Sequence, residues 1–157
     1  MNILKIIAFT SVFLITQNIY AKTTISHAIA MHGEPKYAED FISVEYISNS
    51  AEKGGAIVRS AIGSYDTFNP FTLKGSSPAG IGLLFESLTL GSSDEAFTEY
   101  GLLAKNIEWP EDRSWVSFTL RKEAEWHDGK KITSEDIIWT FNTLMEKGHP
   151  FYGYYYG

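Results

Sequence analysis

The sequence predicts an α/β fold, because segments with strand patterns are followed by a helix with clear start and stop signals. Residues 114–121 alternate polar and apolar side chains, which is typical of a strand with one buried face. Residues 133–147 place apolar side chains at helical spacing instead. The chain has 157 residues and 44% of them are apolar, so it holds material for about one packed domain.

The first 21 residues have the pattern of a secretory signal peptide. Lys5 is their only charge and precedes an apolar run over residues 6–15, and Ala21 is a small residue suited to cleavage. The run is shorter than the roughly 20 apolar residues that span a membrane, which argues against an anchor. We therefore expect residues 1–21 to be removed and the mature chain to be exported, and a bacterial periplasm fits this pattern.

Three segments follow before the main strand region. Residues 22–49 are polar and mixed, and they predict an irregular leader that ends in a turn-forming cluster. Residues 56–63 are mostly apolar and end in Gly63, which predicts a buried strand. A loop comes next, and residues 81–88 are apolar on most sides, which predicts a short buried helix.

Strand patterns dominate from Tyr100 onward. Residues 103–109 and 114–121 flank a short acidic turn, so we expect them to form a β-hairpin. Residues 125–127 predict a short third strand that closes at an Asp–Gly turn.

The helix over residues 133–147 has signals at both ends. Thr133 is a suitable N-cap, and Asp136 lies three positions later, where a capping box places an acidic residue. Gly148 and Pro150 end the helix. One apolar face is expected, formed by Ile137, Ile138, Phe141, Leu144 and Met145.

Composition excludes several functions. The formal net charge of −6 argues against nucleic-acid binding, which needs clustered Lys and Arg. The absence of Cys excludes disulfides, thiolate zinc sites and a Cys nucleophile. The histidines lack the spacing of a zinc site, so we expect neither a metal nor another cofactor; they are His27, His32, His127 and His149.

Charged side chains give no clear catalytic group. Paired acids such as Asp94 and Glu95 lie in polar stretches, and we interpret them as solvated loop residues. His127 beside Asp128 resembles a general base with its orienting group, which suggests a secreted hydrolase as an alternative function. The geometry of a tight Asp–Gly turn explains that pair better, so we expect no enzyme.

Aromatic residues offer a candidate binding loop. Tyr65, Phe68 and Phe71 lie directly after the predicted strand over residues 56–63. Ligands of open α/β sheets bind outside the carboxyl ends of strands, where aromatic rings and Asn69 could stack on and hydrogen-bond a ligand. Packing in the core explains each ring at least as well.

Four stretches carry a more specific pattern. The most specific covers residues 126–137, with a strand, a His–Asp–Gly turn and a Thr–Ser–Glu–Asp helix start in that order. The others are residues 53–70, 84–88 and 103–121. Together they resemble the extracellular solute-binding proteins of family 5, the peptide-, dipeptide- and nickel-binding receptors of ABC importers.

Two further stretches, residues 31–37 and 147–152, resemble the branch typified by the oligopeptide- and microcin-binding receptor of the Yej transporter. The resemblance implies a type II periplasmic-binding-protein fold, whose two lobes close on a peptide by a hinge motion. It also implies a monomer in the periplasm that delivers oligopeptides to an ABC permease.

The resemblance adds candidate site residues. In relatives, the loop between the Asn–Pro turn and the next helix faces the cleft, and here that loop is residues 74–80. Taken with the aromatic loop, it gives six candidate ligand-binding residues: Phe68, Asn69, Phe71, Ser76, Ser77 and Ala79.

The resemblance also divides the chain. After the signal peptide, we expect an irregular leader over residues 22–52, the start of the first lobe over 53–99, and a strand-rich subdomain with one helix over 100–157. Family members are several domains long, so the chain resembles an N-terminal fragment with part of the first lobe only. A structural remnant that pairs with a separately encoded partner is the other alternative.

Overall fold

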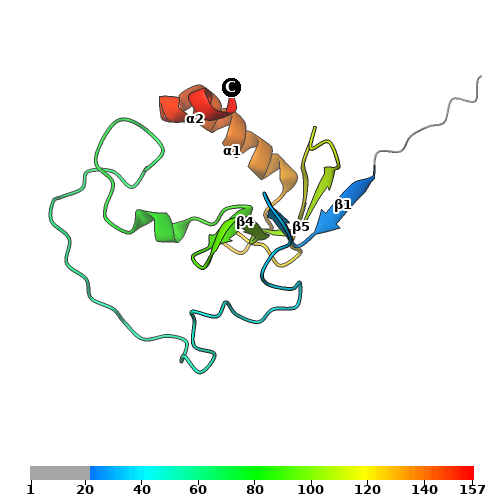
Figure 1. Ribbon diagram of the computed structural model, residues 1–157. Coiled ribbons are helices and arrows are strands. Elements are labelled where there is room, and N and C mark those ends of the chain that lie inside the picture. The colour runs from blue at the N-terminus through cyan, green and yellow to red at the C-terminus, as the bar shows by residue number, and fades with distance from the viewer. Residues whose placement is uncertain (1–21) are drawn as a thin grey trace, which may run out of the picture.

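The computed structural model describes residues 22–157, so the predicted signal peptide lies outside the described residues. It is a small mixed α/β unit (Figure 1). No helix within residues 22–157 is long and apolar enough to cross a membrane. The elements are β1 (Thr23–Ser26), β2 (Ala28–Ala30), the 3-10 helix η1 (Ile81–Leu84), β3 (Thr89–Ser92), β4 (Glu95–Gly101), β5 (Ala104–Pro110), β6 (Ser117–Leu120), α1 (Ser134–Lys147) and α2 (Pro150–Tyr156).

The strands form two antiparallel three-stranded sheets. One has the order β1-β5-β6 and the other has the order β2-β4-β3. The chain changes sheet at His27, between β1 and β2, and again between β4 and β5. Gly101 fits this second corner, because a Cβ there would collide with the Ala104 carbonyl group. The two corners tie both sheets into one body.

The buried core is small and joins these sheets to residues of the leader and of the segment after β6. Its hydrophobic members are Ala28, Tyr37, Tyr100, Ala104, Ile107 and Ala124. Tyr37 and Tyr100 pack edge to face, with ring centroids 5.8 Å apart. An aromatic contact of the core therefore joins the leader to β4.

The predicted hairpin over residues 103–121 is confirmed. β5 and β6 pair antiparallel, with Ile107 opposite Phe118 and Glu108 opposite Ser117. Phe118 and Leu120 are half-buried while their neighbours on β6 are exposed, as the alternating pattern predicted.

The predicted helix is also confirmed as α1. The Thr133 side chain accepts the Asp136 N–H, and the Asp136 carboxylate accepts the Thr133 N–H at 2.9 Å, so the capping box is complete. The helix ends at Gly148, whose N–H donates to the Leu144 carbonyl oxygen. The predicted apolar face of α1 is not buried. The helix contacts the short helix α2, but none of its own residues is buried.

The prediction of a wholly irregular leader is wrong at its start. Residues 23–26 and 28–30 form β1 and β2, which pair with β5 and β4. These strands have only four and three residues, which is too short to give a local signal. Their partners, about 70 to 90 positions further along the chain, stabilise them.

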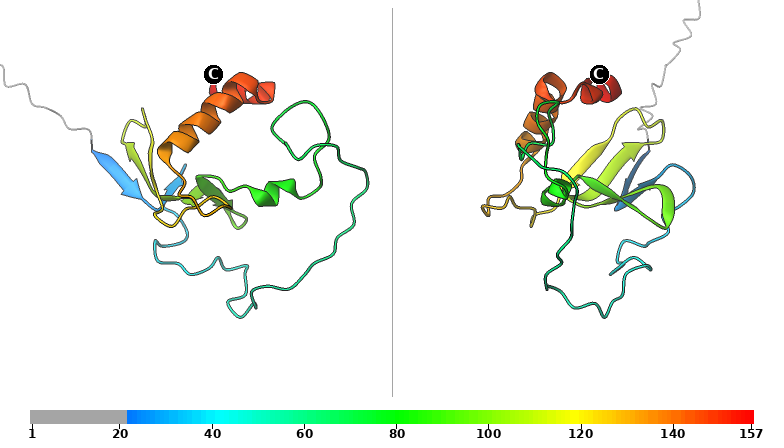
Figure 2. Two further views of the ribbon diagram at one scale, coloured as in Figure 1. Left: turned by 180° about the vertical axis from the view of Figure 1, so that it is seen from behind. Right: turned by 90° about the vertical axis from the view of Figure 1, so that its left-hand side faces the viewer.

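The predictions for residues 56–63 and 81–88 are wrong as well. The first segment is an irregular, exposed arc in which Ile57 is 88% and Val58 is 98% exposed (Figure 2). A strand needs a partner, and none of the described strands pairs with it. In the second segment only Ile81–Leu84 are helical, as the exposed η1, and Phe85 is extended.

Three smaller features of the structure also differ from what the sequence predicted. The strand region begins before Tyr100, because β3 and β4 form a hairpin that the sequence did not indicate. Residues 125–127 form only an isolated bridge between Glu125 and Lys131. The Tyr- and Gly-rich tail forms α2, with Pro150 as its first residue.

We predict that Thr133→Ala lowers the free energy of unfolding by about 1 kcal/mol, because the N-cap oxygen is lost. Urea unfolding followed by circular dichroism measures this change. Thr140→Ala, on the exposed part of the same helix, is the matched control and should not destabilise. An equal loss in both variants would contradict the capping role of Thr133.

Candidate functional site

The six predicted ligand-binding residues lie together on one closed loop, residues 66–80. The Asp66 and Thr67 N–H groups donate to the Ser76 carbonyl oxygen at 3.0 and 3.3 Å. The Ser76 N–H donates to Asp66 Oδ1 at 2.6 Å. Gly75 has a φ of 86°, and a Cβ there would collide with Thr67 and Asp66. The loop therefore needs glycine at this position to close.

The six candidates fall into two groups: residues that remain available at the surface, and residues that make contacts within the fold. Phe68 is 66% exposed and contacts Tyr65, with ring centroids 5.2 Å apart. Ser76 and Ala79 are exposed and Ser77 is half-buried. These four residues, Phe68 with its ring and the serines with their hydroxyl groups, remain available to a ligand.

Asn69 and Phe71 have structural contacts within the fold. The Asn69 side-chain oxygen accepts the Phe71 N–H at 3.0 Å, which closes a local turn. The Phe71 ring packs edge-on against Phe85 at 5.0 Å. Its carbonyl oxygen accepts the His149 N–H at 2.9 Å, so Phe71 joins the loop to the start of α2.

The His127–Asp128 pair does not form a catalytic dyad. Asp128 accepts the Lys130 N–H at 3.1 Å and pairs with its ammonium at 2.7 Å. The side-chain bond to Lys130 lowers the pKa of Asp128. Within residues 22–157 no hydrogen bond joins Asp128 to the His127 ring, and Gly129 completes a tight turn with a φ of 83°. The geometry of this tight turn therefore accounts for the arrangement of His127 and Asp128.

A polar cluster, which we call the Lys36 network, was missed by the sequence analysis. The Lys36 ammonium lies 2.8 Å from both Glu45 Oε2 and Asp94 Oδ2. The Tyr37 hydroxyl donates to Asp94 and accepts the Glu45 N–H at 2.9 Å. Asp94 lies in the exposed turn between β3 and β4, as interpreted, but its carboxylate is paired and its side chain is only 25% exposed.

The second half of the network lies around Tyr100. Its hydroxyl donates to Glu95 and accepts the Tyr37 N–H at 3.1 Å. Glu95 also accepts the Lys36 N–H at 2.9 Å and the Thr98 hydroxyl at 2.9 Å. Glu95 was likewise interpreted as solvated, but its carboxylate satisfies donors from the leader and from β4.

The network shifts pKa values in the directions that keep its ion pair charged. The hydrogen bond from Lys36, with further bonds from Ser92 and Tyr37, holds the pKa of Asp94 well below its usual range. The bonds to Asp94 and Glu45 raise the pKa of Lys36. Burial, with the bond to Asp94, raises the pKa of Tyr37.

Burial and hydrogen bonds also shift the pKa values of Tyr100 and Glu95. Burial and then the bond to Glu95 raise the pKa of Tyr100. Burial opposes ionisation of Glu95, but hydrogen bonds from Tyr100 and Lys36 outweigh it and lower the pKa of Glu95. Each shift moves its group away from titration near neutral pH, and the network fastens the leader to the β3–β4 hairpin.

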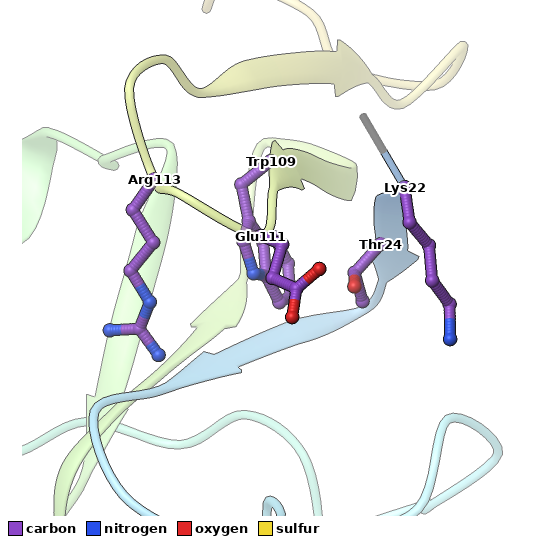
Figure 3. A pocket seen from close by; sticks show the side chains of 5 residues that line it. All are labelled: Lys22, Thr24, Trp109, Glu111 and Arg113. Carbon is purple, nitrogen blue, oxygen red and sulfur yellow. The ribbon is translucent and has the colours of Figure 1, made fainter. Parts of the chain in front are cut away.

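A pocket of about 410 Å³ lies at the end of the sheet β1-β5-β6 (Figure 3). Five side chains line it: Lys22, Thr24, Trp109, Glu111 and Arg113. The sequence analysis did not indicate it, because the lining comes from two segments that only the β1–β5 pairing brings together. Within residues 22–157 no group of three or more His, Asp or Glu side chains could hold a metal ion.

We predict that Asp94→Asn lowers the urea midpoint of unfolding at neutral pH. The pKa of Asp94 is lowered by folding, so its charge stabilises the fold above the unfolded pKa of about 4, and this stabilisation is lost as the carboxylate is protonated. The difference between wild type and variant should therefore shrink from about pH 5 to about pH 2.

Glu99→Gln is the control for this prediction, because Glu99 is an exposed acid on the same strand, β4. Its urea midpoint should stay close to that of the wild type at each pH. A difference for Asp94→Asn that is constant over the pH series, or that is matched by Glu99→Gln, would contradict the role of the ion pair.

Comparison with known proteins places the chain in a family. Residues 98–157 match the family model described as bacterial extracellular solute-binding proteins, family 5 Middle. The "Peptidoglycan-binding protein YepA" of Agrobacterium fabrum is 44% identical over 132 residues, which cover 79% of this chain and 22% of the relative.

Two YejA proteins are also similar. The "Uncharacterized protein YejA" of Escherichia coli is 38% identical, with 80% of this chain and 21% of the relative covered. The "Probable peptide-binding protein YejA" of Agrobacterium fabrum is 34% identical, with 81% and 21% covered. The chain spans about a fifth of the length of these curated relatives. As its motifs predicted, the chain belongs to the bacterial extracellular solute-binding proteins of family 5 and is related to their Yej-type members.

Proposed function

We propose that this chain is part of the solute-binding component of an ABC importer, which binds oligopeptides and delivers them to a membrane permease. The family match over residues 98–157 supports a solute-binding role. The name of the 34% identical relative, a probable peptide-binding protein, supports the ligand class.

The observation that carries the proposal is the closed loop over residues 66–80. It carries the exposed Phe68 ring and the hydroxyl groups of Ser76 and Ser77 on segments that the backbone bonds from Asp66 and Thr67 to Ser76 bring together. An aromatic ring provides apolar contact to a peptide side chain, and hydroxyl groups pair with peptide N–H and C=O groups without reading the sequence. Such a surface suits a receptor with loose sequence preference.

The proposal places the protein in the periplasm, as a monomeric binding protein without enzymatic activity. An N-terminal signal over residues 1–21 would supply the export, and the permease in the inner membrane would be the partner. Hinge closure on the peptide would couple binding to delivery.

A peptide derived from peptidoglycan is a second candidate ligand. The relative with 44% identity is named a peptidoglycan-binding protein. Peptidoglycan carries short peptides in the same compartment, so this ligand is a special case of the oligopeptide class. Comparing a muramyl peptide with trialanine in the titration below separates the two candidates.

We predict that trialanine shifts the backbone amide signals of residues 66–80 when it is titrated into the ¹⁵N-labelled chain, while the signals of α1 stay in place. Nuclear magnetic resonance detects weak binding, which suits a chain that spans about a fifth of its relatives. Phe68→Ala should weaken binding about threefold or more, because an exposed stacking surface is removed.

Leu73→Ala is the matched control, since Leu73 lies on the same loop, is 67% exposed and is not a candidate contact. It should leave the affinity unchanged. Shifts that avoid residues 66–80, or an equal loss of affinity in both variants, would contradict the proposal.

A further inference from the structure

The pairing of β1 with β5 places four side chains on one face of the sheet. Thr24 lies opposite Trp109. One step outward, the Glu111 N–H donates to the Lys22 carbonyl oxygen at 3.2 Å, so these two residues are also cross-strand neighbours. Side chains two positions apart on a strand point to the same face, so Lys22 and Thr24 face the same side as Trp109 and Glu111.

Arg113 completes the group from the turn between β5 and β6. Figure 3 shows its guanidinium at one end of the pocket and the Lys22 ammonium at the other, with Glu111, Thr24 and Trp109 between them. The Trp109 indole is the half-buried member and the other four side chains are exposed. The pocket is therefore an open trough with an aromatic wall and a cation at each end.

These charged groups have few partners within the fold. Among the described residues, no ion pair within 4.0 Å involves Lys22, Glu111 or Arg113, although they carry opposite charges and line one pocket. Within residues 22–157 the guanidinium makes one hydrogen bond, a long one from Arg113 Nη2 to the Ala30 carbonyl oxygen at 3.4 Å. The side chains are thus free to pair with a ligand.

The backbone of Arg113 is held in an unfavourable conformation. Its φ is 53°, in the left-handed region that residues with a Cβ avoid. Turns of this kind usually place Gly or Asn at such a position. The sequence therefore keeps a guanidinium at the pocket where glycine would fit the turn better, and strain of this kind points to a functional role.

We propose that this trough is a binding site for a short acidic peptide that carries two carboxylates and one free ammonium. Arg113 and Lys22 pair with the two carboxylates, Glu111 pairs with the ammonium, and Trp109 packs against the intervening carbon atoms. The volume of about 410 Å³ is within the range of sites for small molecules. The site is separate from the loop over residues 66–80 and does not depend on it.

The dipeptide Ala-Glu tests the proposal, because at neutral pH it has two carboxylates and one ammonium. It should move the indole N–H signal of Trp109 in the ¹⁵N-labelled full chain, and Trp109→Phe identifies that signal among the four tryptophans. Ala-Gln lacks one carboxylate, and acetylated Ala-Glu lacks the ammonium. Each should bind about two- to fivefold more weakly, as expected for the loss of one exposed ion pair.

Arg113→Gly is the most informative variant, because it removes the guanidinium while relaxing the backbone. It should weaken Ala-Glu binding about two- to fivefold without lowering the melting temperature. Lys22→Gln should weaken binding to a similar extent and provides the test if Arg113→Gly alters the turn. Arg59→Gln removes an exposed arginine from the arc outside the pocket and is the matched control.

Three outcomes would overturn the proposal. The Trp109 signal could stay in place throughout the Ala-Glu titration, Ala-Gln could bind as well as Ala-Glu, or Arg59→Gln could weaken binding as much as Lys22→Gln. Because the readout is Trp109 and not the amides of residues 66–80, this site and the proposed function fail independently of one another.

Discussion

The fold depends on the packing of Tyr37 against Tyr100 with both hydroxyl groups hydrogen-bonded. The two rings join the leader to β4 and contribute about 0.5–1.5 kcal/mol beyond the area that they bury. A buried hydroxyl without a partner would cost about 1–3 kcal/mol, and the carboxylates of Asp94 and Glu95 remove that cost. Since the leader continues from β1 and β2, fixing it at Tyr37 also supports the pairing of both strands, and that pairing builds the pocket at Trp109.

Elements with a local signal could be predicted from the sequence, and elements that depend on distant partners could not. The capping box of α1 lies within four residues, and the β5–β6 hairpin joins neighbouring segments. In contrast, β1 pairs with a strand about 85 positions away, and Lys36 reaches Asp94 across 58 positions. No pattern of fixed spacing marks such contacts. The apolar run over residues 56–63 gave the opposite error, because apolar composition indicates a strand only where a partner strand is present.

In the candidate site, too, the sequence indicated local features but not those that depend on contacts between distant segments. Sequence reasoning grouped residues of one loop, since they are neighbours in the chain, and hydrogen bonds between Asp66 and Ser76 close that loop. It could not tell which side chains the fold already uses, and therefore grouped Asn69 and Phe71 with the exposed Phe68. Nor could it find the trough at Trp109, whose lining exists only after β1 and β5 have paired. The loop lies against the start of α2, where the Phe71 carbonyl oxygen accepts the His149 N–H, and the trough lies at the end of the sheet β1-β5-β6.

Hydrogen exchange read by mass spectrometry, on the chain alone and with trialanine, tests the central claim most directly. That claim is that a strand-paired body supports an exposed loop that binds peptide. The slowest exchange should occur in β4 and β5, and residues 52–65, which have no backbone hydrogen bond within the described chain, should exchange fastest. Trialanine should slow exchange in residues 66–80 and leave α1 unchanged. Rapid exchange throughout β4 and β5, or no effect of the peptide on residues 66–80, would contradict this account.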